Sequence, residues 1–164
     1  TRLHDRIDAL VHGKQLDAAE LPDDERPVVE GFQRWAASSG LVLDPRGDTV
    51  VFSRRYQFAG ALDALARRES DGGLVVLDFK TSNSVHDSYA MQLAAYAHAV
   101  EEMELLGGGG ASAVAEARVV LFDKASGAVT EHRVADLRTA FDGFKAALLL
   151  WRLGRTKLLE NARR

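Results

Sequence analysis

The chain has 164 residues, of which 46% are hydrophobic and 27% are charged, and it contains no cysteine. This is the composition of an ordinary globular domain, and we expect a single domain over residues 1–164. The missing cysteines exclude disulfides, thiolate zinc sites and cysteine-ligated iron–sulfur clusters. The formal net charge of −3 argues against a general polyanion-binding protein.

The hydropathy pattern argues against a membrane location. No apolar run approaches the ~20 residues that a helix needs to cross a bilayer, and no signal-peptide pattern opens the chain. We therefore expect a cytoplasmic protein without a membrane partner.

The first half of the chain begins with two predicted helices. Apolar residues recur at helical spacing over residues 2–12, and again after Pro27, which suits the first turn of a helix. Gly40 is a suitable end for this second helix. Three β-strands are then predicted, at 49–58, 59–68 and 73–81. The sequence "SDGG" at 70–73 is typical of a hairpin turn between the last two.

The second half begins with the strongest helical pattern, at residues 87–106. The glycine-rich stretch 107–112 lacks the Lys-Ser/Thr ending of a phosphate-binding loop, so we expect a flexible loop and no nucleotide cofactor. Two strands and a closing helix follow, at 116–124, 128–135 and 136–153. Trp35 and Trp151 lie on apolar helix stripes, and we expect both in the core. The order α-α-β-β-β-α-β-β-α predicts an α/β domain with a mixed central β-sheet flanked by helices.

The strand "VVLDFKTS" at 75–82 carries two charges in an apolar run. Strand side chains alternate between faces, so Asp78 and Lys80 share one face and Phe79 points to the other. The apolar residues 74–77 predict a central strand that is covered on both sides. Because burial of an unpaired charge is costly, Asp78 and Lys80 form either a structural ion pair or part of a reaction centre.

A second carboxylate, Asp63, lies in another apolar strand. The turn at 70–73 can fold this strand back on the next one and place Asp63 beside Asp78. Two neighbouring carboxylates repel each other, and a divalent cation relieves the repulsion. Oxygen ligands favour Mg²⁺ or Mn²⁺. Gly60 permits the close approach of another backbone or a ligand, or else marks a β-bulge.

Gln92 and Tyr96 are spaced i, i+4 on the helix predicted after these strands, so their side chains face one direction. Each also has an ordinary structural interpretation. Tyr96 lies on the apolar stripe of the helix and suits the core, whereas Gln92 lies at the edge of that stripe, where polar residues are common.

Four sequence features now occur in a recognisable order: His4 in "TRLH", Gly60–Asp63 as "GxxD", residues 78–80 as "DxK", and Gln92–Tyr96 as "QxxxY". Together they resemble the PD-(D/E)XK nuclease superfamily, and most closely its RecB-type exonuclease branch. The resemblance covers roughly residues 1–105. It implies a restriction-endonuclease-like core and a metal-dependent active site.

The resemblance also implies roles for individual residues. Asp63 and Asp78 would be metal ligands, together with the backbone carbonyl of Phe79, and His4 would be a further ligand of the kind that favours manganese. Lys80 would orient or activate the attacking water and stabilise charge at the scissile phosphate.

Other expected roles and departures concern the surroundings of this site. Gln92 and Tyr96 would contact the nucleic-acid backbone. Many relatives have a glutamate before the "GxxD" strand, where this chain offers only Asp48. The iron–sulfur cysteines and the ATPase domain that some relatives carry are not found in the sequence.

The implied activity is that of a metal-dependent deoxyribonuclease, an exonuclease that acts on linear DNA ends in recombination, repair or phage DNA processing. Its setting would be the cytoplasm of a bacterial or phage-infected cell, either as a separate enzyme or within a larger protein. Two alternatives remain. One is a catalytically inactive nucleic-acid-binding domain of the same fold, and the other is an unrelated α/β protein in which Asp78 and Lys80 form a structural pair.

Overall fold

The computed structural model describes residues 2–46, 49–81, 84–103 and 113–157. Within these ranges the chain forms the following elements: α1 (Arg2–Val11), the short 3₁₀ helix η1 (Ala18–Glu20), α2 (Arg26–Ser38), β1 (Leu41–Leu43), β2 (Thr49–Ser53), β3 (Phe58–Leu62), β4 (Ala64–Arg68), β5 (Leu74–Lys80), α3 (Asp87–Met103), β6 (Val114–Phe122), β7 (Val129–Arg133) and α4 (Leu137–Leu153). The glycine-rich stretch 107–112 and Asp48 lie outside the described residues.

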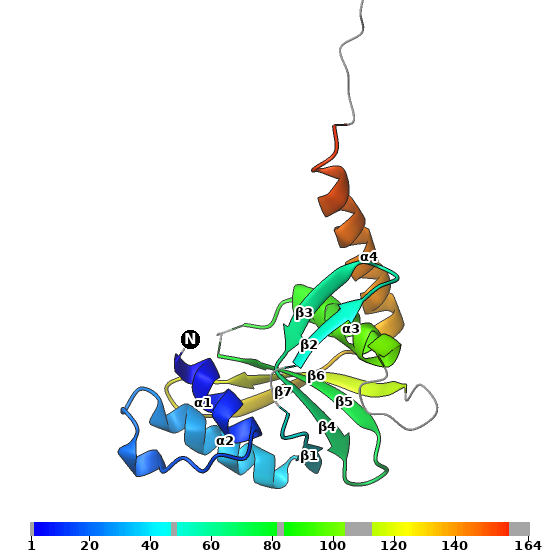
Figure 1. The fold of residues 1–164 in the computed structure, drawn as a ribbon. Helices are drawn as coiled ribbons and strands as arrows, with labels where there is room; N and C mark the ends of the chain where they lie inside the picture. Colours follow the sequence, from blue (N-terminus) through cyan, green and yellow to red (C-terminus); the bar gives the residue numbers. More distant parts are fainter. Residues whose placement is uncertain (1, 47–48, 82–83, 104–112, 158–164) are drawn as a thin grey trace, which may run out of the picture.

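A five-stranded mixed sheet forms the centre of the molecule, with the strand order β1-β4-β5-β6-β7 (Figure 1). The pair β5–β6 is parallel and the other neighbouring pairs are antiparallel. The predicted mixed sheet flanked by helices is therefore confirmed. So is the central position of β5, in which every residue from Leu74 to Phe79 is buried and only Lys80 is half-buried.

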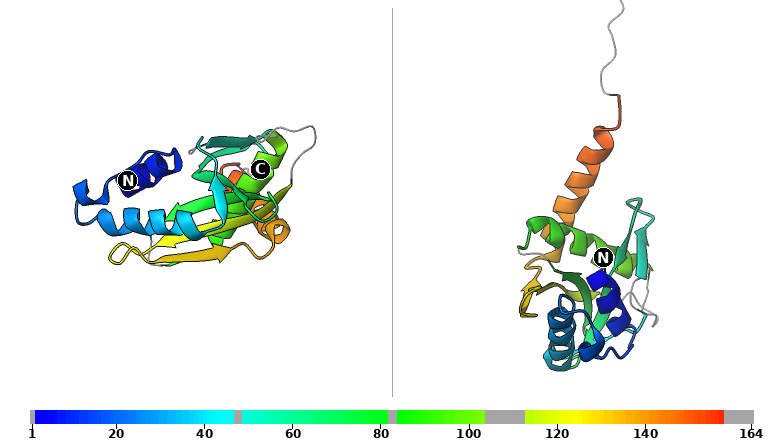
Figure 2. Two further views of the ribbon diagram at one scale, coloured as in Figure 1. Left: turned by 90° about the horizontal axis from the view of Figure 1, so that it is seen from below. Right: turned by 90° about the vertical axis from the view of Figure 1, so that its left-hand side faces the viewer.

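Helices cover both faces of this sheet. α1 and α2 lie on one side, and α3 lies on the other together with the two-stranded sheet β2–β3 and the first part of α4 (Figures 1 and 2). α2 begins as predicted, with Pro27 in its first turn. After its end, Gly40 adopts a φ of +66°, a left-handed conformation that glycine tolerates without steric cost.

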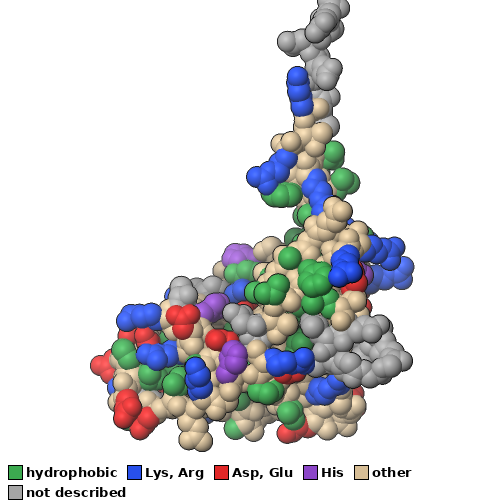
Figure 3. Space-filling view, viewed as in Figure 1, with side chains coloured by type: hydrophobic (Ala, Val, Ile, Leu, Met, Phe, Trp, Pro, Cys, Tyr) green, Lys and Arg blue, Asp and Glu red, His purple; other side chains and the backbone are tan. Residues whose placement is uncertain are grey.

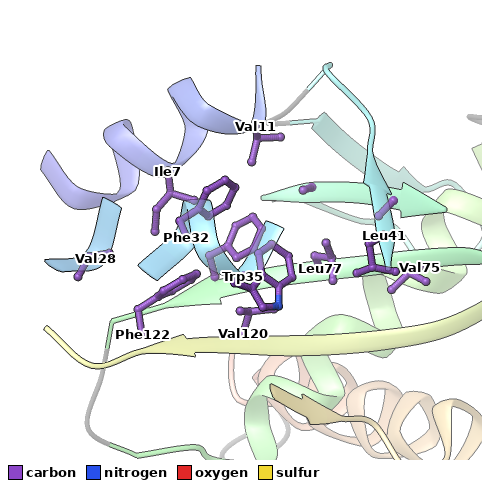
Figure 4. Close-up of a cluster of buried hydrophobic side chains, with 13 residues drawn as sticks. Ile7, Val11, Val28, Phe32, Trp35, Leu41, Val75, Leu77, Val120 and Phe122 are labelled. Atoms are coloured by element: carbon purple, nitrogen blue, oxygen red, sulfur yellow. The ribbon is translucent and has the colours of Figure 1, made fainter. Parts of the chain in front are cut away.

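The core on the α1–α2 side is rich in aromatic rings (Figure 4). Phe32 and Trp35 of α2 pack on Phe79 of β5, with ring centroids 5.5 and 5.6 Å apart. Trp35 is thus in the core, as predicted. Because Phe79 points into this core, its neighbours Asp78 and Lys80 emerge on the opposite face of β5, toward α3.

The second core lies between the sheet and α3. Leu93, Tyr96 and Val100 of α3 are buried in one cluster with Val76 of β5 and Val119 of β6. Their spacing along the helix places them on one face, which explains why this segment forms a long helix against the sheet. The charged face of β5 therefore borders an apolar interface and has little access to water.

The strands before β5 differ from the expectation. The predicted strand 49–58 ends as β2 at Ser53, turns back through Gln57 with a φ of +55°, and continues as β3, which pairs antiparallel with β2. The predicted strand 59–68 is interrupted at Asp63, because β3 belongs to the small sheet and β4 to the large one. β1, at the edge of the large sheet, was not predicted. Alternating hydropathy identifies extended segments but does not tell to which sheet each belongs.

The predicted hairpin between β4 and β5 is confirmed. The Gly72 N–H donates a hydrogen bond of 2.8 Å to the carbonyl of Arg68, and the Arg68 N–H donates one of 2.9 Å to the carbonyl of Gly73. Gly72 has a φ of +71°, which favours glycine at this position. The turn sets the register in which Ala64 pairs with Leu77.

The prediction that Trp151 lies in the core is wrong. The first half of α4 packs on the body, where the Phe141 ring stacks on His98 of α3 at 4.3 Å between centroids, and further along Arg152 donates hydrogen bonds to the carbonyls of Tyr56 and Gln57. The second half projects beyond the body, and hydrophobic and basic side chains are visible along the projection (Figures 1 and 3). Trp151 is 59% exposed and Leu150 is 69% exposed. Within the described residues, no helix is both long and apolar enough to span a membrane.

Candidate active site

Asp63 and Asp78 come together where the chain leaves the small sheet and enters the large one. Asp63 is the residue between β3 and β4. Since Ala64 pairs with Leu77 in the antiparallel β4–β5 ladder, Asp63 lies beside Asp78. The predicted neighbourhood of the two carboxylates is thus present, although it arises at a break between strands.

Lys80 completes this group from the same face of β5. Its ammonium nitrogen Nζ lies 2.8 Å from Oδ1 of Asp78, to which it donates a hydrogen bond, and 2.7 Å from Oδ2. Asp78 is 3% exposed, and its Oδ2 is buried without a hydrogen bond from any described residue. The ion pair is therefore real, but it stands next to a second carboxylate, and the contact of the ammonium with Oδ2 is ionic without the geometry of a hydrogen bond.

The backbone of Phe79 holds Asp63. The Phe79 N–H donates a hydrogen bond of 2.7 Å to Oδ2 of Asp63. Its aromatic ring is fixed in the opposite core, so the amide that orients this carboxylate has little freedom to move. The contact that the structure shows for Phe79 is made by the amide N–H, whereas the role of the carbonyl as a ligand stays a prediction.

Both carboxylates have a raised pKa. Burial is the largest cause at Asp63, the negative charge of Asp78 raises its pKa further, and the Phe79 N–H, Lys80 and His4 lower it in part. At Asp78, burial raises the pKa and the ammonium of Lys80 offsets part of this effect. Two carboxyl groups that share a desolvated place are poorly stabilised as two anions. The site thus favours an added positive charge.

His4 approaches the same group from α1. It is half-buried, and its charge contributes to lowering the pKa of both Asp63 and Asp78. The described residues nevertheless include no cluster of three or more His, Asp and Glu side chains that could hold a metal ion. His4 therefore stands near the carboxylates without forming a preassembled three-ligand site.

The donor set fits a hard divalent cation. Asp63 and Asp78 present carboxylate oxygens in a poorly solvated place, and Oδ2 of Asp78 lacks a hydrogen-bond donor. Oxygen donors of this kind are those that Mg²⁺ and Mn²⁺ prefer. A bound cation would supply the positive charge that both raised pKa values show to be lacking.

Gly60, Gln92 and Tyr96 form one packed unit beside the carboxylates. The Gln92 side-chain amide donates a hydrogen bond of 2.8 Å to the Tyr96 hydroxyl. The Tyr96 ring lies directly over Gly60, where a Cβ atom would be 2.5 Å from ring carbon Cε1 and 2.9 Å from the hydroxyl oxygen. The structure rejects the β-bulge and shows a close approach that the sequence analysis did not include. The β2–β3 register runs without a bulge, and the close approach is made by a tyrosine side chain.

We expect Gly60→Ala to lower the free energy of unfolding by about 1–3 kcal/mol, because the added methyl group overlaps the buried Tyr96 ring. Urea unfolding followed by fluorescence measures this change. Gly154→Ala is the matched control, since a Cβ there makes only an ordinary contact of 3.5 Å. An unchanged stability of Gly60→Ala would contradict this packing. So would a double variant Gly60→Ala/Tyr96→Ala whose loss of unfolding free energy equals the sum of the two single losses.

Tyr89 is a neighbour of Lys80 that the sequence did not reveal. The Lys80 ammonium lies 5.3 Å from the centroid of the Tyr89 ring, a cation–π distance. On its other side, the Tyr89 ring meets the His86 ring at 5.5 Å between centroids. The helical pattern places Tyr89 on the apolar stripe of α3, but it carries no information about which residue of β5 lies opposite.

Comparison with known proteins agrees with this geometry. The model of the PD-(D/E)XK nuclease superfamily matches residues 2–158, which include both carboxylates, the lysine and the tyrosine packed over glycine. A search of curated protein sequences finds no match. The family match covers nearly the whole chain, and the fold has the mixed sheet of a restriction-endonuclease-like protein. The chain belongs to the PD-(D/E)XK nuclease superfamily.

Proposed function

We propose that the protein is a metal-dependent deoxyribonuclease, and specifically an exonuclease that degrades linear DNA from its ends. The observation that carries the proposal is the group of Asp63, Asp78 and Lys80. Two adjacent carboxylates with raised pKa values have a lysine ammonium 2.7–2.8 Å from one of them. Membership of a nuclease superfamily supports hydrolysis of a phosphodiester bond as the reaction.

The acidic residues hold the cation in this proposal. Asp63 and Asp78 are the carboxylate ligands of Mg²⁺ or Mn²⁺, and His4 and the carbonyl of Phe79 are further ligands. When bound, the cation supplies Lewis-acid charge for the phosphate and a more acidic water. The hydrogen bond from the Phe79 N–H to Oδ2 holds the carboxylate of Asp63 in place. It leaves the other oxygen, Oδ1, available to the cation.

Lys80 acts on the reacting groups directly. Its side chain is 21% exposed, so the ammonium lies at the boundary between the buried carboxylates and solvent. From there it can orient the attacking water and stabilise negative charge on the scissile phosphate. The Tyr89 ring, 5.3 Å away, limits the positions that this flexible side chain can take.

Gln92 and Tyr96 bind the nucleic-acid backbone beside this centre. Gln92 is half-buried and uses one amide hydrogen on the Tyr96 hydroxyl, which leaves its second N–H as a donor to a phosphate oxygen. Tyr96 is 8% exposed and fixes the orientation of Gln92 from the core.

The biological setting belongs to the same proposal. The order His4, "GxxD", "DxK" and "QxxxY" supports the RecB-type branch, with a role in recombination, repair or phage DNA processing in the cytoplasm of a bacterial or phage-infected cell. Residues 1–164 would form a single nuclease domain, either alone or within a larger protein.

A nuclease assay tests the function. Purified protein with Mg²⁺ or Mn²⁺ should shorten end-labelled linear DNA and leave circular DNA intact, and EDTA should stop the reaction. Cleavage of circular DNA would show an endonuclease instead. Binding of DNA without cleavage in either metal would support the catalytically inactive alternative.

We expect Tyr89→Ala to lower kcat by about 2- to 30-fold, because an exposed or partly desolvated cation–π contact contributes ~0.5–2 kcal/mol to the position of Lys80. Tyr89→Phe keeps the aromatic face and should retain most of the activity. Steady-state kinetics on linear DNA distinguishes the two variants. Equal losses in both would show that the hydroxyl group, and not the ring over Lys80, is what matters.

A further inference from the structure

A cavity of about 320 Å³ lies where the start of α3 meets β6 and β7, on the face of the sheet that carries Asp78. Its position follows from the sheet register. Asp78 of β5 pairs with Val119 of β6, which pairs with His132 of β7, so these three side chains lie on the same face of the sheet. The cavity is lined by Val119, one strand spacing or roughly 5 Å from Asp78, and by His132, two strand spacings or roughly 10 Å from it.

The lining of the cavity is mostly apolar with polar groups at its edge. The apolar lining residues are Val85, Ala90, Val119, Val134 and Ala135. The polar lining residues are His86, Asp87, His132 and Arg133, and all four are exposed. No described residue makes a hydrogen bond or ion pair with the His132 side chain, which leaves its ring available to a ligand.

This chemistry suits a heterocyclic base better than a phosphate. No lysine lines the cavity, and Asp87 would repel an anion. Arg133 also lines it, but successive strand residues point to opposite faces, and the charge of Arg133 lowers the pKa of Glu116 on the α2 side of the sheet. An apolar floor, imidazole rings that stack and a carboxylate that accepts from base N–H groups are typical contacts of an unstacked base.

Side chains connect the cavity to the catalytic lysine. The ring of His86, at the cavity edge, meets the ring of Tyr89 at 5.5 Å, and the Tyr89 ring lies 5.3 Å from Nζ of Lys80. A strand whose backbone lies at Lys80 could therefore place a neighbouring base over His86 and into the cavity.

We propose that this cavity, here named the base pocket, binds an unstacked nucleobase of the substrate strand next to the scissile phosphate. The inference rests on the proposed function for the position of that strand. A duplex keeps its bases paired and stacked, so the base pocket selects single-stranded or frayed ends over intact duplex.

Abasic-site scanning tests the base pocket. Fluorescence anisotropy measures binding of labelled single-stranded DNA with Mg²⁺, in a Lys80→Ala background that slows cleavage, with readings taken before the DNA is cut. One abasic position, moved along the strand, should weaken binding about tenfold at one place, the loss expected for a stacked base. His132→Ala should weaken binding of intact DNA by a similar factor, and the abasic position should then have little further effect.

Two variants control for indirect effects. His132→Phe keeps a stacking ring and should preserve the abasic penalty, whereas His12→Ala removes an exposed histidine just after α1, outside the pocket, and should behave like the parent. The same abasic penalty with and without His132 would overturn the proposal, as would equally tight binding of duplex. The proposal would also be overturned if the loss of binding in His132→Ala depended on replacing a phosphate by a neutral methylphosphonate and did not depend on removing the base.

The failure of the base pocket and the failure of the nuclease function can be told apart. If the protein with its native Lys80 cuts DNA but the abasic penalty is independent of His132, the nuclease function stands and the pocket proposal falls. If no DNA is cut but the penalty disappears in His132→Ala, the pocket binds a base in a catalytically inactive domain.

Discussion

Replacing Lys80 with alanine should lower the rate of phosphodiester hydrolysis by about 10²- to 10³-fold, the loss typical when one group that stabilises transition-state charge is removed. The position of Lys80 explains the expected loss. This lysine is the cation bonded to Asp78, and its ammonium is at the boundary between the buried carboxylates and solvent. Cleavage of end-labelled linear DNA at saturating Mg²⁺ measures the loss as a change in kcat.

Lys80→Ala should still fold. Loss of the ammonium removes an interaction that lowers the pKa of Asp78, so this pKa rises further and the carboxyl holds a proton more readily in the metal-free protein. A neutral carboxyl is much less costly to bury than an unpaired anion. Circular dichroism and urea unfolding check the fold, and Lys124→Ala, an exposed lysine in the β6–β7 turn, is the matched control.

The result also separates the two interpretations of the ion pair. If Lys80→Ala loses stability but keeps its activity per folded molecule, Asp78 and Lys80 form a structural pair and the proposed mechanism is wrong. If it loses activity and keeps its fold, Lys80 belongs to the reaction centre.

Asp63→Asn should have opposite effects on stability without and with metal. Burial and the charge of Asp78 raise the pKa of Asp63 in the folded state, so the folded protein holds this proton more tightly than the unfolded chain does. The protonated Asp63 therefore stabilises the folded state. This stabilisation is fully present below the ordinary pKa of an aspartate and is lost as pH rises through the raised folded-state pKa. Asparagine resembles the neutral carboxyl and keeps an oxygen for the Phe79 N–H.

In EDTA at pH 8, Asp63→Asn should accordingly be more stable than the parent by about 0.5–2 kcal/mol, the usual gain when a functional site is relaxed. The difference should shrink as the pH is lowered. With Mg²⁺ or Mn²⁺ the order should reverse, because the cation stabilises the parent by ~2.7 kcal/mol at a hundredfold excess over Kd and binds the variant weakly. Activity should fall below detection under the same conditions.

Urea unfolding at several pH values, with EDTA or with metal, measures these differences. Asp71→Asn is a control of opposite sign. Hydrogen bonds from the Gly73 N–H and from Arg68 lower the pKa of Asp71, so its replacement should destabilise the protein at neutral pH and have less effect in acid. An Asp63→Asn variant that is less stable than the parent in EDTA at pH 8 would contradict the electrostatic account of the site.

Much of the catalytic group follows from local rules. Alternation along β5 places Asp78 and Lys80 on one face and Phe79 on the other, and the aromatic contacts of Phe79 confirm that direction. The turn at 70–73 has the residues of a tight hairpin, and its register brings Asp63 to Asp78. These features depend on residues close in sequence, so their geometry can be read from the order of the residues.

The surroundings of the group do not follow in this way. Sequence patterns placed Asp63 inside a continuous strand, whereas the chain passes there from the small sheet to the large one. They offered a backbone, a ligand or a β-bulge as explanations for Gly60, whereas the structure places the Tyr96 ring over it. Each of these features depends on two elements far apart in the chain, and the pattern of one element does not identify its partner.

The amino-acid sequence by itself determined the helices, the central strand β5, the hairpin and the carboxylate–lysine group, because helix and strand periods, turn residues and the cost of burying charge act over short distances. Only the tertiary structure decided that Tyr89 lies over Lys80, that a cavity forms between the start of α3, β6 and β7, and that Trp151 is exposed at the end of a projecting helix. An apolar stripe shows which side of a helix can be buried, but whether another element covers it depends on how the whole chain packs.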